Sequence, residues 1–428
     1  KNKKEVLATF KVASILKSKS EVTLKNEDGF SVSLSFSYAN SQGHDPSAYS
    51  YAFPLAYLSI AYLWYFPQHY TIPFWLNLVA TSTVLIYVGS HLSLILRDDT
   101  EVLDENGEPV YFYGEGETMK MEDAQKFPFI GSAALFGLFC AFKFLDPDWV
   151  NWVISFYFTA AGAMAVMGTL IPIIEQVPPM AKTWTKKFSF KHSLPEALVG
   201  PSPMKFTLSV SGAIVVAGLV ALAVGERYFN TKHWTLNNVL GICFILQGIS
   251  MFSIGSFKIA AALLVGLFFY DVFWVFGTPV MVTVAKKLDG PIKLLFPRSL
   301  VPNDLGKLDL SLLGLGDIVI PGFLISFMLR FDAHRARIPR VYDPIAKFPK
   351  PYFHSILAAY VVGLCTTLYM MTRFQAAQPA LLYLVPACLG AVLLCGTIRG
   401  EMKEVWEFTE EEEVEEEKAA EDEAKKKK

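Results

Sequence analysis

Long apolar runs alternate with short polar connections over most of this chain of 428 residues. A helix needs about 20 mostly apolar residues to cross a membrane. Nine runs meet this requirement, at about 74–96, 127–145, 149–174, 206–225, 235–256, 259–285, 309–331, 352–372 and 379–398. The pattern therefore predicts an all-α, polytopic membrane protein folded as a bundle of nine transmembrane helices.

The N-terminal region, residues 1–73, has a different pattern. Residues 30–38 alternate strictly between polar and apolar and follow a turn sequence at 26–29, which predicts a small β-hairpin over 21–38. A further uncharged run at 47–66 is rich in Tyr and contains Pro54. This run suits an interfacial segment as well as a tenth span, so the side of the membrane that holds the N-terminus stays open.

The composition supports a membrane protein. Only 18% of the residues are charged and 53% are hydrophobic, whereas a typical soluble protein is about 25% charged. This balance excludes a disordered chain and argues against an ordinary soluble enzyme. The five Cys all lie in apolar runs without CxxC spacing, so we expect neither a disulfide framework nor a metal site. Nothing in the sequence calls for a cofactor or for a nucleic-acid partner.

Charged residues divide the rest of the chain and orient it. We expect five membrane helices over 74–256, four more over 257–400, and an acidic tail over 401–428 with 13 acidic and 6 basic residues. If the C-terminus is cytosolic, every second loop is cytosolic too. These loops contain more Lys and Arg than the loops on the opposite side, as expected for cytosolic loops. The tail ends in four Lys, which resembles a retrieval signal for the endoplasmic reticulum.

Two Asp lie deep inside predicted spans. Asp271 interrupts an apolar run in one span, and Asp317 interrupts another in the next. At a rise of about 1.5 Å per residue, they lie roughly 18 Å and roughly 21 Å from the same membrane face, so they can face each other. Ionisable groups at this depth cost about 2.5–3.5 kcal/mol or more and usually mark a functional site. Arg330 and Asp332 lie near a span end, where we expect them to reach the membrane surface.

The pair of Asp suggests a particular chemistry. No Lys or Arg lies at the same depth, and two neighbouring carboxylates in a low dielectric cannot both ionise, so the pair should share one proton. The ionised Asp can take a proton from water as it attacks a peptide carbonyl, while the protonated Asp supports the developing oxyanion. The pair therefore supplies one acid and one base in a single site within the membrane, the combination that hydrolysis of a peptide bond requires.

Glycine and proline occur next to these spans. Gly314 and Gly316 precede Asp317, and two Gly so close together indicate close backbone approach or a locally unwound helix entry. Pro379 and Pro386 lie in the last span. They should leave backbone groups free to pair with an extended substrate.

Three motifs in order resemble a known family. They are Tyr270-Asp271, Gly314-Leu315-Gly316-Asp317 and Pro379-Ala380-Leu381. They are similar to the motifs of the GxGD intramembrane aspartyl proteases, and within that group they resemble the signal peptide peptidases more than the presenilins. The similarity extends from about Phe127 to Gly400.

The resemblance implies a nine-span protease of the endoplasmic reticulum membrane that needs no metal or cofactor. It implies that Asp271 and Asp317 are catalytic. The residues implied to shape the site or engage substrate are Tyr270, Gly314, Leu315, Gly316, Gln378, Pro379, Ala380 and Leu381. Its substrates would be transmembrane helices in the lipid bilayer, chiefly remnant signal peptides and segments of type II orientation. Further partners would be a second copy of the chain and protein-degradation machinery.

Two alternative functions stay open at the level of sequence. Paired intramembrane Asp also bind ions or protons in transporters and leak channels. A transporter would be expected to show matched Asp-bearing segments in its two halves, and the first five spans contain none. A non-proteolytic scaffold for membrane-protein degradation is the other alternative, with the acidic tail recruiting partners.

Overall fold

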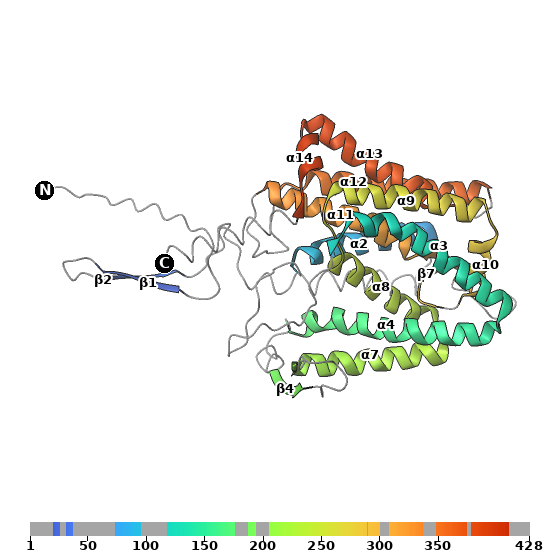
Figure 1. The fold of residues 1–428 in the computed structure, drawn as a ribbon, viewed down its shortest axis with the longest axis horizontal. Coiled ribbons are helices and arrows are strands. Elements are labelled where there is room, and N and C mark those ends of the chain that lie inside the picture. Colours follow the sequence, from blue (N-terminus) through green and yellow to red (C-terminus); the bar gives the residue numbers. More distant parts are fainter. Residues whose placement is uncertain are drawn as a thin grey trace. The chain divides into compact units, whose positions relative to one another are not determined.

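The computed structural model describes residues 20–25, 31–36, 73–95, 118–175, 187–193, 205–288, 290–299, 308–336, 348–374 and 378–410 (Figure 1). The chain divides into two compact units. One unit comprises residues 53–409, and the other comprises residues 1–52 and 410–428. The proposed segment at 47–66 and the terminal lysines lie outside the described residues.

The smaller unit contains the predicted hairpin. Strand β1 (Ser20–Lys25) pairs antiparallel with β2 (Ser31–Phe36), and Ser20 lies opposite Phe36. The polar–apolar alternation and the turn sequence between the strands had predicted this pairing, which is confirmed.

The larger unit is a helical bundle. Eight helices within the described residues are long and apolar enough to cross a membrane. They are α2 (Phe74–Ile95), α3 (Met121–Phe144), α4 (Pro147–Glu175), α7 (Gly212–Thr231), α8 (Trp234–Met251), α9 (Phe257–Phe276), α12 (Pro351–Phe374) and α13 (Leu381–Arg399). A further helix of similar length, α11 (Gly316–Arg335), carries four Asp and Arg residues. These helices confirm a polytopic membrane protein.

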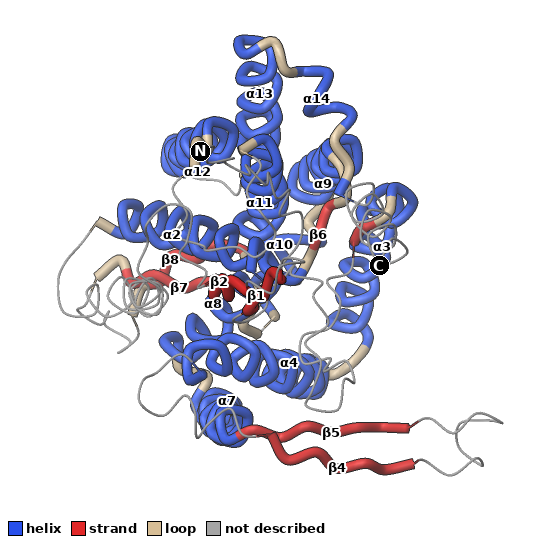
Figure 2. The backbone as a smooth tube through the Cα atoms, turned by 90° about the vertical axis from the view of Figure 1, so that its left-hand side faces the viewer, coloured by secondary structure: helices blue, strands red, loops and turns tan. Residues whose placement is uncertain are grey.

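Helix α11 lies at the centre of the bundle, among α2, α8, α9, α12 and α13 (Figure 2). Its residues from Gly322 to Ala333 are buried without interruption. A helix that is buried on every side has neighbouring helices, not lipid, as its surroundings. Helices α4 and α7 pack together on the far side of α8 from α12 and α13 (Figure 1).

The central position of α11 corrects one expectation. Arg330 and Asp332 do not extend to the outside of the bundle, because protein covers them to exposed fractions of only 8% and 2%. Arg330 Nη1 donates to Ser93 Oγ of α2 at 2.9 Å. The Asp332 carboxylate accepts the backbone N–H groups of Tyr352 and Phe353, where α12 begins. Both charges therefore join α11 to its neighbouring helices.

Three predicted spans also have different boundaries. The span at 309–331 begins as a strand, β8 (Leu310–Gly314), and becomes helical only at Gly316. The span at 259–285 breaks after Phe276, and its remainder forms α10 (Val280–Lys287). Gly277 and Pro279 lie at this break, between the end of α9 and the start of α10. A Cβ at Gly277 would lie 2.6 Å from the Phe273 carbonyl oxygen, so the chain there needs a residue without a side chain. The first residues of the span at 206–225 belong to β5 (Lys205–Ser211).

Short strands connect the helices. Strand β7 (Lys293–Pro297) pairs antiparallel with β8, with Lys293 opposite Gly314. Strand β4 (Lys187–Ser193) pairs antiparallel with β5, and β3 (Thr118–Met119) pairs parallel with β6 (Ser253–Ile254). The β7–β8 pair matters most for the site, because it leads directly into α11. A short last helix, α14 (Met402–Glu407), follows α13.

Candidate active site

Asp271 projects from α9 toward the beginning of α13. Its side chain is 5% exposed, and its Oδ2 accepts the backbone N–H of Leu381 at 3.0 Å. This N–H is in the first turn of α13, where a helix has no internal acceptor for its amides. The contact joins two of the three sequence motifs across 110 residues.

Asp317 occupies the first turn of α11 and is therefore not in the middle of a long helix. It is partly exposed, and it lies close enough to Asp271 for the two carboxyl groups to interact electrostatically. A Cβ built on Gly314 would be 3.2 Å from Asp317 Oδ2. Gly314 thus lets the end of β8 pass directly beside the carboxyl group. The predicted unwound entry before Asp317 is confirmed by the strand that ends there.

Leu315 connects β8 to α11. Its backbone N–H donates to the Ile292 carbonyl at 3.0 Å, and its own carbonyl accepts the N–H groups of Ile318 and Val319. Its side chain packs near Gly241 of α8, where a Cβ would lie 3.4 Å from Leu315 Cδ2. Leu315 therefore fixes the point at which the strand turns into the helix that carries Asp317.

Two asparagines of α8 hold the β7–β8 hairpin, and neither was among the residues predicted to form the site. The Asn238 amide donates to the Leu295 carbonyl at 2.7 Å and accepts the Leu295 N–H at 2.8 Å. Asn237 Nδ2 donates to the Lys293 carbonyl at 2.7 Å. Asn238 therefore pairs with β7 as another strand would. Adjacent buried Asn in an apolar helix are unusual, and that signal could have identified them.

The beginning of α13 differs from one expectation. The carbonyls of Pro379 and Ala380 accept N–H groups from Leu382, Tyr383 and Leu384. The Leu381 N–H is bound by Asp271. These groups next to Pro379, which we expected to be free for a substrate, are thus engaged within the protein, and α13 continues through Pro386.

Gln378 accepts a hydrogen bond from the Tyr383 hydroxyl at 3.2 Å, and Pro379 and Ala380 are buried. These contacts fold the segment before α13 against the first turn of that helix. The segment therefore helps to hold the Leu381 N–H in place against Asp271.

Comparison with known proteins decides the family. The sequence model described as signal peptide peptidase matches residues 114–412, which include both Asp and all three motifs. The chain belongs to the signal peptide peptidase family. Human signal peptide peptidase is 37% identical over 294 residues, which cover 69% of this chain and 74% of the human protein.

Two further relatives carry related names. Intramembrane protease 2 of Caenorhabditis elegans is 43% identical over 205 residues, covering 46% of this chain and 42% of the relative. A probable intramembrane protease of Schizosaccharomyces pombe is 42% identical over 200 residues, covering 46% of this chain and 64% of the relative. Membership in the family makes the chain an intramembrane-cleaving aspartic protease and a multi-pass membrane protein.

Tyr270 lies between Asp271 and α3, and it is close enough to Asp271 to interact with it electrostatically. Its ring lies against α3, where a Cβ on Gly131 would be 3.6 Å from Tyr270 Cε2, and it also contacts Trp274. Tyr360 of α12, which the sequence analysis did not identify, is fully buried and lies close enough to Asp317 to interact electrostatically. As one aromatic residue among many, Tyr360 gave no distinctive signal in the sequence.

Proposed function

We propose that Asp271 and Asp317 are the catalytic pair of this protease and that its substrates are remnant signal peptides and type II membrane segments. The hydrogen bond from the Leu381 N–H to Asp271 carries the proposal. Leu381 of the third motif binds Asp271 of the first motif, and Asp317 of the second motif lies near Asp271. The three motif segments therefore meet at one pair of carboxyl groups. The human relative is named signal peptide peptidase, which supports the substrate class.

The proposed reaction is hydrolysis of a peptide bond by a general acid and a general base. The ionised Asp removes a proton from water, and the resulting hydroxide adds to the carbonyl carbon. The protonated Asp donates a hydrogen bond to the oxyanion. When the C–N bond breaks, a proton passes to the leaving nitrogen, and the products are a carboxylic acid and an amine. The pair is then ready to share one proton again.

The substrate must be extended where it is cut, because the peptide bonds of a membrane helix are hydrogen-bonded within the helix. Strand β8 ends at Gly314, three residues before Asp317. One edge of β8 pairs with β7, and Asn238 binds the far edge of β7. We therefore place an extended substrate along the outer edge of β8, where strand addition would lead its backbone to the two Asp.

Cleavage of a labelled signal-peptide helix by the purified full chain in detergent tests this function. We expect substrates with two Gly near the scissile bond to be cut roughly 10- to 30-fold faster than the matched Leu substrate, because each Gly weakens a helix by about 1 kcal/mol. The control substrate carries the same two Gly at the far end of its helix. Equal rates for all three substrates would contradict the need for unwinding.

We also propose that the protease resides in the endoplasmic reticulum membrane with its C-terminus in the cytosol. The excess of Lys and Arg in alternate loops supports this orientation. In sealed microsomes, an epitope added at the C-terminus should be digested by external protease without detergent. Protection of the epitope until detergent is added would reverse the orientation. Self-association and contact with degradation machinery remain predictions from the family resemblance.

A further inference from the structure

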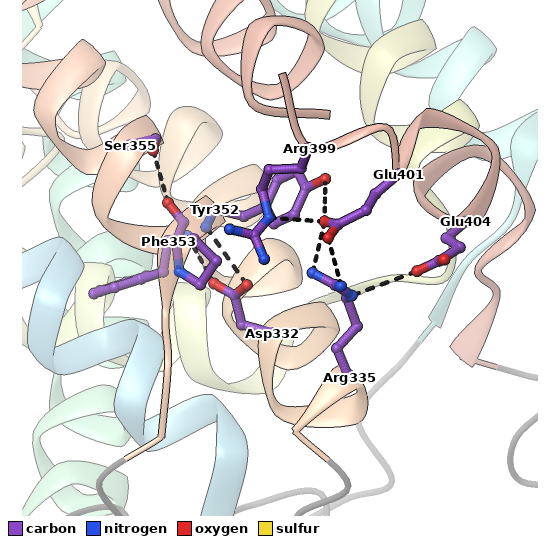
Figure 3. A network of polar contacts seen from close by, with 9 residues as sticks. Asp332, Arg335, Tyr352, Phe353, Ser355, Arg399, Glu401 and Glu404 are labelled. Carbon is purple, nitrogen blue, oxygen red and sulfur yellow. Dashed lines mark hydrogen bonds and ion pairs between the residues drawn. The ribbon is translucent and has the colours of Figure 1, made fainter. Parts of the chain in front are cut away.

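A charged cluster joins the C-terminal ends of α11 and α13 (Figure 3). Arg335, the last residue of α11, donates two hydrogen bonds to the Glu401 carboxylate, each 2.6 Å long. Glu401 also accepts the Tyr352 hydroxyl at 3.1 Å and Arg399 Nε at 2.9 Å. Only 13% of the Glu401 side chain is exposed. A bidentate and largely buried ion pair of this kind fixes the relative orientation of the two side chains as well as the distance between them.

The surroundings of Glu401 keep it ionised. Burial by itself would raise the pKa of its carboxyl group, but the hydrogen bonds from Arg399 and Tyr352 and the charge of Arg335 outweigh burial. The pKa of Glu401 therefore lies below its ordinary value. The Arg335–Glu401 pair persists above this pKa and is lost only as the pH falls through it.

A sharp turn after α13 aims Glu401 back at α11. Gly400 has a φ of +70°, a left-handed conformation that strongly favours Gly. The Glu401 N–H then donates to the Gly396 carbonyl at 2.9 Å. A Cβ at Gly396 would lie 2.9 Å from Met402 Sδ, so the small residue also lets the returning chain pass.

Residues 401–409, here called the strap, continue from this turn across the beginning of α9. Val405 is fully buried, and the Trp406 ring lies 5.7 Å from the ring of Phe257, the first residue of α9. Thr409 pairs as an isolated β-bridge with Ser256, which caps α9. The strap is therefore packed against the helix that carries Asp271.

The strap also contacts α11. The ring of Phe408 lies 5.2 Å from Phe331 and 5.6 Å from Phe327. Helices α9, α11 and α13 carry Asp271, Asp317 and the Leu381 N–H near one end. The strap contacts each of these helices near its other end. At about 1.5 Å per residue, α13 extends about 28 Å from Leu381 to its last residue. A displacement of α13 along its axis at one end would thus reach the other.

We propose that Glu401 is a positioning residue: through Arg335 it fixes the axial position of α13 relative to α11, and thereby keeps the Leu381 N–H against Asp271. This inference rests on the proposed catalytic role of Asp271 and Asp317. Glu401, a residue of the acidic C-terminal region, would thus set the geometry of a site at the other end of α11 and α13.

The same segment offers a matched control. Lys403 and Glu407 form an ion pair on α14 at 3.8 Å, with side chains 84% and 63% exposed. Exposed pairs of this kind contribute little, because water and salt screen them. Loss of this pair removes a charge only a few residues from Glu401 without disturbing any of the contacts between helices described above.

The test compares kcat, KM and the thermal midpoint for the full chain and for Glu401→Gln, Arg335→Lys and Lys403→Gln. In Glu401→Gln we expect kcat to fall roughly 10- to 100-fold with KM within about 3-fold, because small misplacements at a reacting centre have effects of this size. Arg335→Lys keeps the positive charge but loses the bidentate geometry, so its kcat should lie between that of the unchanged chain and that of Glu401→Gln. Lys403→Gln should behave as the unchanged chain.

The outcomes separate this inference from the proposed function. If the unchanged chain does not cleave the labelled helix, the proposed function fails. If it cleaves, and a folded Glu401→Gln variant keeps kcat within about 2-fold, the positioning role is overturned. Should Glu401→Gln lose its cooperative thermal transition, Arg335→Lys decides: a normal midpoint with reduced kcat supports positioning, and an unchanged kcat refutes it.

Discussion

Replacing either Asp271 or Asp317 by Asn should abolish cleavage of a labelled signal-peptide helix, with an expected loss of at least ~10³-fold in kcat. Asn has almost the same shape as Asp but cannot ionise, so the pair can no longer hold one proton between an acid and a base. Both variants should keep their fold, since the side-chain oxygen of the Asp271→Asn variant can still accept the N–H of Leu381. The measurement is product formation by the purified full chain in detergent.

Asp148→Asn provides the control, because Asp148 is exposed in the first turn of α4. This variant should cleave at the rate of the unchanged chain. A kcat that falls by much less than about 10³-fold in either Asp271→Asn or Asp317→Asn would exclude the shared-proton mechanism. If both Asp variants instead lost an ion flux while the unchanged chain showed no proteolysis, the transporter alternative would replace the proposed function.

Gly314→Ala should reduce kcat roughly 10- to 100-fold with little change in KM. The added Cβ would lie 3.2 Å from Asp317 Oδ2, which is closer than an ordinary van der Waals contact. The carboxyl group must then move by a few tenths of an ångström, or the end of β8 must move away from it. Because Gly314 has no positive φ, Ala adopts the same backbone, and the effect should be confined to the site.

Gly390→Ala is the matched control for this glycine. It lies on an exposed position of α13, and a Cβ there would meet nothing within 4 Å. Ala is also the better helix former, so the control should be at least as stable as the unchanged chain and equally active. A Gly314→Ala variant with unchanged kcat would mean that Asp317 has room to adjust without cost.

The sequence predicted the bundle, and it predicted that Asp271 and Asp317 would meet, because the depth of a residue in a membrane helix follows from a constant rise per residue. It did not predict that Asp317 begins its helix. Residues 310–314 are apolar except for Ser311, and an apolar run of that length does not distinguish a buried strand from the first turn of a helix. Only the pairing of β8 with β7 shows the difference.

Two further features could not be predicted, because they depend on contacts between helices. They are the burial of Arg330 and Asp332 and the packing of the strap. Position near the end of a span indicates access to the membrane surface, but α11 has other helices on every side. Glu401 reads as the first residue of an acidic tail, whereas its contacts with Arg335 and Tyr352 depend on where two other helices end. The apolar residues Val405, Trp406 and Phe408 were the local signal that the chain stays folded there, and Val405 and Phe408 are buried.

The buried position of α11 has a consequence for how this protein is made. Asp317, Arg330, Asp332 and Arg335 give that helix a low affinity for lipid, at a cost of about 2.5–3.5 kcal/mol for each charge placed at the bilayer centre. Its insertion must therefore be driven by neighbours rather than by its own hydrophobicity. Helices α2, α8 and α9 precede it in the chain and are synthesised first, while α12 and α13 follow. Because α12 and α13 are among the neighbours of α11, that helix can be fully surrounded by protein only after they have been synthesised, so its final packing is a late step in biogenesis.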